Sequence, residues 1–261
     1  MAFQAVFKRV EKKYILDEQQ YNELRKRLEA YMTVDQYGET TICNIYYDTP
    51  EHLIVRRSLE KPIYKEKLRV RSYGTPGEGG TLFVEIKKKF KSVVYKRRTS
   101  MKLEQFEDFN SGLSISSKDK QIENELLYFM KFYKGIAPAM YLSYDRIALF
   151  GNEDKELRVT FDRNLTFRED DLRLESGSYG RKAIPEGMRI MEIKITNAMP
   201  LWLSHILDEL KIFPASFSKY GTCYTIVQNE KKQQEKAEKD EAAPSSNNVP
   251  TQMKDRVTNC A

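Results

Sequence analysis

Alternating apolar and charged residues predict several β-strands in this chain. Residues 67–71 read Lys-Leu-Arg-Val-Arg, and residues 83–87 read Phe-Val-Glu-Ile-Lys. The same alternation recurs over residues 157–162 and 191–195. Successive side chains of a strand point to opposite faces of a sheet, so each of these strands has one apolar face and one charged face.

The charged faces carry Lys and Arg, whereas a sheet face that only meets water is expected to mix Ser, Thr, Gln and Asn. Twice a glutamate stands two residues before a lysine, as in Glu85 with Lys87 and Glu192 with Lys194. We therefore predict that these faces line a charged interior, whose natural ligand is a polyanion. The alternative is an outer, solvated face with weak surface ion pairs.

The wider pattern predicts about eight mostly antiparallel strands with helices between groups of them. The strands are expected over residues 8–16, 42–47, 67–73, 82–88, 93–99, 140–150, 157–162 and 188–195. The helices are expected from the cap residue Asp17 to Met32, and over residues 103–109, 120–133, 201–210 and 218–227. This order predicts an α+β fold in which an antiparallel eight-stranded β-barrel with flanking helices encloses a lumen.

Length and composition predict one large domain over residues 1–228 and a charged, disordered tail over residues 229–261. The net charge of +6 lies in the domain, because the tail holds six basic and six acidic residues. No apolar run approaches the roughly 20 residues that cross a bilayer, and the N-terminus lacks a signal-peptide stretch. A cytoplasmic location is therefore expected.

Three widely spaced cysteines and two histidines disfavour a disulfide framework, a zinc site and a Ser-His or Cys-His mechanism. Any metal would be held by oxygen ligands, which favours Mg²⁺ or Mn²⁺. The Gly-rich phosphate cradles G-x-x-x-x-G-K-[ST] and G-x-G-x-x-G are both missing from the sequence.

Further basic positions share predicted faces. Lys96 and Arg98 lie on one face of their strand, and Tyr144 and Arg146 lie on one face of theirs. Residues 218–219, Ser-Lys, begin a predicted helix, where free N–H groups can bind an anion. A solvated basic run and an ordinary helix cap remain the alternatives for these positions.

Nine motifs, taken in order, resemble the polyphosphate polymerase domain of the vacuolar transporter chaperone complex, a member of the triphosphate tunnel metalloenzymes or CYTH-like superfamily. The resemblance covers residues 8 to about 226. The motifs are E-K-K-Y (11–14), I-Y-Y-D-T (45–49), K-L-R-V-R (67–71), F-V-E-I-K (83–87), K-R-R (96–98), S-Y-D-R (143–146), L-R-V-T-F-D (157–162), M-E-I-K (191–194) and F-S-K-Y (217–220).

The resemblance implies a tunnel whose basic walls bind the triphosphate of ATP and a growing polyphosphate chain, with Mn²⁺ or Mg²⁺ held by glutamate. The catalytic residues are expected to be Arg69, Arg71, Lys87 and Arg158. Phosphate binding is expected of Lys13, Lys96, Arg98, Tyr144, Arg146, Lys194, Ser218 and Lys219. The expected metal ligands are Glu192, Glu85 and Glu11.

The leading functional prediction is therefore a metal-dependent ATP:polyphosphate phosphotransferase. The same tunnel would also suit a triphosphatase acting on inorganic or nucleoside triphosphates, or a non-catalytic polyphosphate-binding module, with a membrane protein left open as a partner. Nucleic-acid binding is not expected, because the basic residues line strands and few aromatics interleave with them.

The chain departs from the family in ways that narrow these expectations. Fungal catalytic members have a further lysine three residues before the one matching Lys219, where this chain has Ser216. The regulatory SPX domain and the membrane segments of the vacuolar proteins have no counterpart here. Inositol-pyrophosphate control and self-contained translocation are accordingly not expected.

Overall fold

A computed structural model of the chain describes residues 10–91, 93–112, 119–196 and 198–242. The chain divides into two compact units, residues 1–224 and residues 225–261. All of the predicted site residues belong to the first unit. Of the tail predicted from residue 229, the part up to Ala242 belongs to helix α6 (Lys219–Ala242), and residues 243–261 lie outside the described residues.

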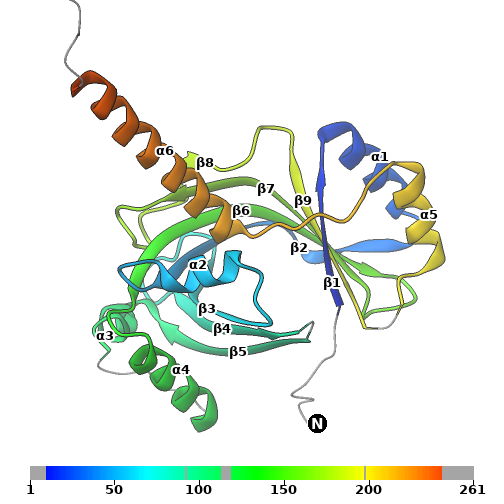
Figure 1. Cartoon of the computed structure of the whole chain (residues 1–261). Helices are drawn as coiled ribbons and strands as arrows, with labels where there is room; N and C mark the ends of the chain where they lie inside the picture. The colour runs from blue at the N-terminus through cyan, green and yellow to red at the C-terminus, as the bar shows by residue number, and fades with distance from the viewer. Residues whose placement is uncertain (1–9, 92, 113–118, 197, 243–261) are drawn as a thin grey trace, which may run out of the picture. The chain divides into compact units, whose positions relative to one another are not determined.

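Within the described residues, nine strands form one antiparallel sheet (Figure 1). Hydrogen-bonded neighbours follow the order β1, β9, β7, β6, β2, β3, β4, β5, and β8 pairs with β7. The strands are β1 (Val10–Leu16), β2 (Met32–Asp48), β3 (Tyr64–Tyr73), β4 (Thr81–Phe90), β5 (Val93–Lys102), β6 (Ala137–Gly151), β7 (Arg158–Arg168), β8 (Arg181–Lys182) and β9 (Arg189–Ile195).

The α+β class and the antiparallel strands are as predicted, but the predicted closed, eight-stranded barrel needs correction. The described sheet has nine strands and is not closed, because β1 and β5 do not pair with each other. The free edge of β1 meets the segment before α6 instead, and the Ala215 amide donates to the Lys13 carbonyl at 2.7 Å. An ion pair of 2.7 Å also joins Glu11 on the edge strand β1 to Lys87 on β4, the strand next to the other edge.

The remaining helices are α1 (Glu18–Leu28), α2 (Leu53–Leu59), α3 (Phe106–Asn110), α4 (Lys120–Phe132) and α5 (Leu201–Glu209). Asp17 caps α1 as predicted, accepting a hydrogen bond of 2.7 Å from the Gln20 amide. The helix ends at Leu28 and not at Met32, because Met32 begins β2 and pairs with Gly151 of β6. Pairing along the long strand β2 thus overrides the helical spacing of the preceding residues.

The apolar strand faces pack against helices in two hydrophobic clusters. Leu68 and Val70 of β3 lie in a cluster with residues of α3 and α4. Val159 and Phe161 of β7 lie in a second cluster with residues of α1 and α5, two helices that lie side by side (Figure 1). Burial of one face in this way leaves the charged face of the same strands on the opposite side of the sheet. Among the described residues, no helix has the length and apolarity that a membrane crossing requires.

Asp48, at the end of β2, joins the start of α2 to Tyr220. The residue is 2% exposed, and one carboxylate oxygen accepts hydrogen bonds from the amides of Thr49 at 2.9 Å and Ile54 at 2.8 Å. The other oxygen accepts from the Val55 amide and the Tyr220 hydroxyl, both at 2.9 Å. The carboxylate therefore fixes the position of Tyr220, next to Lys219.

We predict that Asp48→Ala lowers the free energy of unfolding by about 3 kcal/mol, because it leaves several buried donors without an acceptor. Urea denaturation measures this change. The matched control is Asp17→Ala, which removes an exposed helix cap and should cost only about 1 kcal/mol. Equal losses for the two variants would show that Asp48 acts only as a helix cap.

Candidate functional site

The charged strand faces enclose a cavity of about 390 Å³, here called the basic cavity. Its walls come from strands β1 to β6 and β9, from helix α2 and from the segment that leads into α6. The lining residues are Glu11, Lys13, Tyr46, Ser58, Lys65, Glu66, Lys67, Arg69, Arg71, Lys87, Lys89, Val94, Lys96, Tyr144, Arg146, Glu192, Lys194 and residues 215–220. The charged interior that the alternation predicted is therefore present.

Strand register places the cations in rows across the sheet. Lys67 on β3 is opposite Lys87 on β4, which is opposite Lys96 on β5. One row outward, Lys65 is opposite Lys89. Because alternate residues face the cavity, each step of two residues along β3 adds another cation to the same wall.

Glu85 is a buried carboxylate that holds three of these cations. Its side chain is 1% exposed and forms ion pairs of 2.6 Å with Arg69, Lys96 and Arg98. Burial alone would raise the pKa of Glu85, but the neighbouring cations hold it well below its ordinary value. Glu85 therefore stays ionised and fixes the arginines in place.

Asp162 on β7 plays the same part on the other side of the cavity. It accepts two hydrogen bonds from the Arg146 guanidinium, at 2.6 and 2.7 Å, and forms a 2.5 Å ion pair with Lys219. Although burial opposes ionisation, Arg146 and Lys219 lower the pKa of Asp162 to about 2. The two-pronged pairing gives Arg146 a fixed orientation.

Arg71 is held by neutral partners. Its guanidinium donates to Asn44 Oδ1 at 2.9 Å and to the Tyr144 hydroxyl at 3.0 Å, and the residue is 5% exposed. Burial would raise the pKa of Tyr144, but Arg71, Arg146 and Lys219 lower it to about 8. The hydrogen-bond partners of Arg71 are therefore neutral, although its charge also helps to lower the pKa of the buried Glu85.

Two cavity lysines, Lys67 and Lys96, have pKa values close to neutral pH. Burial, with Lys13 and Lys65 nearby, lowers the pKa of Lys67 to about 7. Burial also lowers the pKa of Lys96 to about 7, in spite of its ion pair with Glu85, because Arg69 and Arg98 add to the effect. A bound polyanion would stabilise the charged form of these lysines.

The segment before α6 completes the cavity wall. The Lys13 ammonium donates to the Phe217 carbonyl at 2.9 Å, and the Lys67 ammonium donates to the Ser218 hydroxyl at 2.9 Å. Tyr220 stacks on Tyr46 with ring centroids 4.9 Å apart. These contacts tie the segment to β1, β2 and β3, and they place Lys219 in the cavity wall.

Two of the predicted metal ligands, Glu192 and Glu11, line the basic cavity. Glu192 forms an ion pair of 3.0 Å with Lys194, and its pKa is well below the ordinary value because neighbouring cations outweigh its burial. Within the described residues, no group of three or more His, Cys, Asp and Glu side chains could hold a metal. Mg²⁺ commonly uses only one or two carboxylates together with substrate phosphates, so Glu192 and Glu11 fit such an ion.

Three predicted residues do not line the cavity. Glu85 shares a strand face with Lys87 but is buried beneath its three cations. Arg98 packs over the ring of Phe83, with 4.4 Å from its guanidinium carbon to the ring centroid. Arg158 is 41% exposed in its side chain and forms a 3.6 Å ion pair with Asp35.

The other twelve predicted residues do line the cavity. They are Glu11, Lys13, Arg69, Arg71, Lys87, Lys96, Tyr144, Arg146, Glu192, Lys194, Ser218 and Lys219. The sequence prediction placed Lys67 on the charged face without giving it a role, and it did not name Lys65 and Lys89, which the same alternation puts there. It also missed Asp162, whose role depends on the register between β6 and β7.

The chain was compared with known protein families and with solved structures. Residues 8–228 match the VTC domain family. The chain belongs to this family. No curated protein matches the chain.

Solved structures support the fold of this VTC domain. A candidate adenylate cyclase from Bacillus halodurans is 11% identical, with a TM-score of 0.53 over 82% of this chain and 96% of that one. A candidate adenylyl cyclase from Hippeastrum, described as having a dominant triphosphatase activity, is 13% identical, with a TM-score of 0.51 over 83% and 95%. The predicted resemblance to a VTC domain is confirmed by the family match, and these two structures share its fold.

We predict that Glu85→Gln lowers the free energy of unfolding of the VTC domain by roughly 3 kcal/mol, because three cations lose their common partner. Thermal or urea denaturation measures the loss, and inorganic triphosphate should restore part of it by neutralising the same cations. Glu39→Gln is the matched control, since its partner Arg163 is a surface residue and such pairs contribute about 1 kcal/mol or less. A loss for Glu85→Gln no larger than for the control would contradict the assigned role.

We also predict that polyanion binding takes up protons. Below about pH 7 Lys67 and Lys96 are already charged, so affinity for inorganic triphosphate should change little with their titration. As the pH rises from about 7 to about 9, the free lysines lose protons that the bound state regains, so affinity should fall by up to about tenfold per pH unit per proton.

Calorimetry in two buffers of different ionisation enthalpy measures this uptake directly. Lys67→Met should reduce the number of protons taken up, because one titrating group is gone. A proton count of zero near pH 8 in the unmodified protein would refute the linkage.

Proposed function

We propose that this VTC domain transfers the γ-phosphate of ATP to the end of an inorganic polyphosphate chain in the basic cavity. The observation that carries the proposal is the charge arrangement. Around Glu85 and Asp162, five cations share two buried carboxylates, which leaves an excess of positive charge. An elongated polyanion would neutralise that excess, and the family match points to the same class of ligand.

The transfer needs no protein nucleophile. A terminal phosphate oxygen of the bound chain attacks the γ-phosphorus of ATP in line, the bond from that phosphorus to the β-phosphate bridging oxygen breaks, and ADP leaves. The chain is then one phosphate longer. Catalysis of such a step comes mainly from positioning and from stabilising the developing charge.

Arg69, Arg71 and Arg146 are the residues best placed to stabilise that charge. Each lines the cavity, and each is held by hydrogen bonds that its guanidinium donates to side chains on neighbouring strands. Preorganised donors of this kind need no rearrangement when charge develops. The lysines Lys13, Lys67, Lys87, Lys96, Lys194 and Lys219 would bind the remaining phosphates.

Glu192, with Glu11 facing the same cavity, would hold Mn²⁺ or Mg²⁺ together with phosphate oxygens. When bound, such an ion neutralises charge on the transferring and leaving phosphates. We do not assign a metal to Glu85, because its carboxylate oxygens are taken up by Arg69, Lys96 and Arg98. Arg158 is given no role here, because it pairs with Asp35 and does not line the cavity, although it lies opposite the cavity residue Lys194.

A second candidate function is hydrolysis of a bound triphosphate, with water in place of the polyphosphate acceptor. The Hippeastrum protein with the similar fold is described with a dominant triphosphatase activity. The same arginines would stabilise the developing charge in both reactions. The two functions differ only in the acceptor, so their products separate them.

The test is incubation of the purified chain with ATP, Mn²⁺ and a short polyphosphate primer, followed by gel analysis of chain length and measurement of ADP and phosphate. Longer chains with ADP are the expected result. Arg69→Ala should lower the rate about 100-fold, because it removes a preorganised donor. Glu192→Ala should make the reaction less sensitive to the divalent ion.

Arg173→Ala is the matched control, since Arg173 is an exposed arginine outside the basic cavity, paired with Asp171. Its rate should equal that of the unmodified chain. Free phosphate without chain growth would replace the transferase with a triphosphatase. Polyphosphate binding without turnover would leave only a binding module, and full activity in Arg69→Ala would refute the assigned site.

A further inference from the structure

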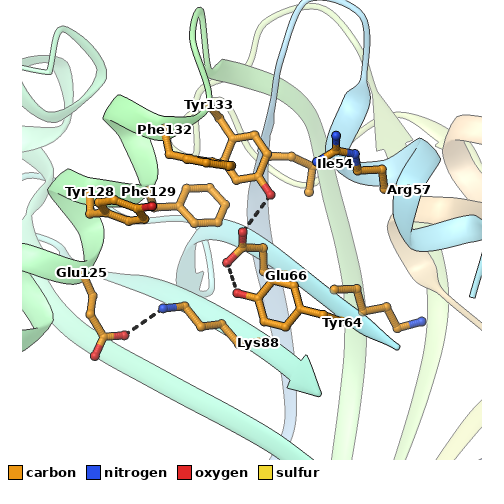
Figure 2. Close-up of a pocket in the computed structure, with 11 residues that line it drawn as sticks. Ile54, Arg57, Tyr64, Glu66, Lys88, Glu125, Tyr128, Phe129, Phe132 and Tyr133 are labelled. Carbon is orange, nitrogen blue, oxygen red and sulfur yellow. Dashed lines mark hydrogen bonds and ion pairs between the residues drawn. The ribbon is translucent and has the colours of Figure 1, made fainter. Parts of the chain in front are cut away.

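A second cavity, here called the aromatic pocket, lies between α2, α4 and strands β3 and β4, with a volume of about 300 Å³. Figure 2 shows its aromatic rings gathered around the carboxylate of Glu66. Tyr64 comes from β3, and the other rings come from or directly follow α4. These rings are Tyr128, Phe129, Phe132 and Tyr133.

Several of these rings are exposed, although burial would stabilise the fold. Tyr128 is 66% exposed, Phe132 is 55% exposed and Tyr64 is 46% exposed. Phe129 and Tyr133, by contrast, are buried in the hydrophobic cluster behind them. The pocket therefore combines a buried base with exposed rings. Tyr128 and Phe132 stack on each other with centroids 5.8 Å apart, and their exposed surface suits the stacking of a planar ligand.

Glu66 provides the polar contact at the centre of the pocket. Its two carboxylate oxygens accept hydrogen bonds from the Tyr64 hydroxyl at 2.6 Å and the Tyr133 hydroxyl at 2.7 Å (Figure 2). Burial and the hydrogen bond to Glu66 raise the pKa of both tyrosines, so both remain donors at neutral pH. A carboxylate has about four acceptor positions, so Glu66 can accept further N–H groups from a ligand.

The aromatic pocket adjoins the basic cavity. Lys65 and Glu66, consecutive on β3, line both of them. Helix α2 also contributes to both, since Ser58 lines the basic cavity while Ile54 and Arg57 line the aromatic pocket. Lys65 and Glu66 point to opposite faces of the sheet, so a ligand with a planar group and a phosphate tail reaches both spaces only by passing around the start of β3.

We propose that the aromatic pocket binds the base of the nucleoside triphosphate whose phosphates occupy the basic cavity, with a preference for a purine. The larger purine ring system covers more of the aromatic surface, and an amino or imino group on its edge can donate to Glu66. This inference rests on the proposed function, because it takes the phosphates to bind in the basic cavity.

The charges of the pocket disfavour a cationic ligand. Arg57, Lys65 and Lys88 line it, against two carboxylates. One of those carboxylates, Glu125, already forms ion pairs of 3.1 Å with Lys88 and with Arg97. A basic side chain inserted among the rings would meet a cationic rim, whereas a base attached to phosphates would not.

The test compares the dissociation constants of ATP and inorganic triphosphate, measured by calorimetry without divalent metal. Tyr128→Ala should weaken ATP binding roughly 10-fold, the scale of losing one base–aromatic stack, and leave inorganic triphosphate unchanged. Tyr128→Phe keeps the ring and should bind ATP as the unmodified chain does. Leu127→Ala is the matched control, because Leu127 is a 40% exposed neighbour on α4 that does not line the pocket.

The outcomes separate this inference from the proposed function. Inorganic triphosphate binding that equals ATP binding in the unmodified chain would overturn the base pocket and leave the polyphosphate function standing. So would a Tyr128→Ala variant that weakens both ligands equally or neither. Failure of the unmodified chain to bind inorganic triphosphate would overturn the proposed function, and the base pocket with it.

Discussion

The basic cavity depends on two buried carboxylates, Glu85 and Asp162, which hold cations from neighbouring strands in fixed positions. Without them, arginines and lysines a few ångströms apart would repel one another and would also lose hydrogen-bond acceptors. With them, the repulsion is reduced but not removed. A ligand that supplies the missing negative charge then stabilises the folded cavity, so polyanion binding and the stability of the walls are linked.

Much of the fold follows from residue alternation, because a period of two fixes which side chains share a face. On β3, the even-numbered residues Leu68 and Val70 lie in a hydrophobic cluster. The odd-numbered residues Lys67 and Arg69 line the cavity, as that rule requires. Residue alternation does not predict whether the sheet closes into a barrel. Closure depends on whether two edge strands meet, and here the edge of β1 is occupied by residues 214–215, which the sequence gives no reason to place there.

The candidate site, like the fold, could be predicted only in part from the sequence. Alternation places most of the predicted cations in the cavity, but partner choice depends on register between strands, which no single strand contains. Asp162 is opposite Arg146 only because β6 and β7 carry an irregularity in their pairing between Ser143 and Asp145. Arg158 remains a predicted phosphate ligand. Its ion pair with Asp35 could not be predicted, because Asp35 lies in a part of β2 that was not predicted as strand.

The arginines and the lysines of the cavity have different properties. Arg69, Arg71 and Arg146 stay charged and are held by directional hydrogen bonds, so they suit a reacting phosphate that needs fixed donors. Lys67 and Lys96 have pKa values lowered to about 7, so they can change charge near neutral pH. Lysines that become fully protonated only while an anion is bound attract a phosphate chain without binding it permanently. Such a wall would let a growing polyphosphate chain move past a fixed reaction site.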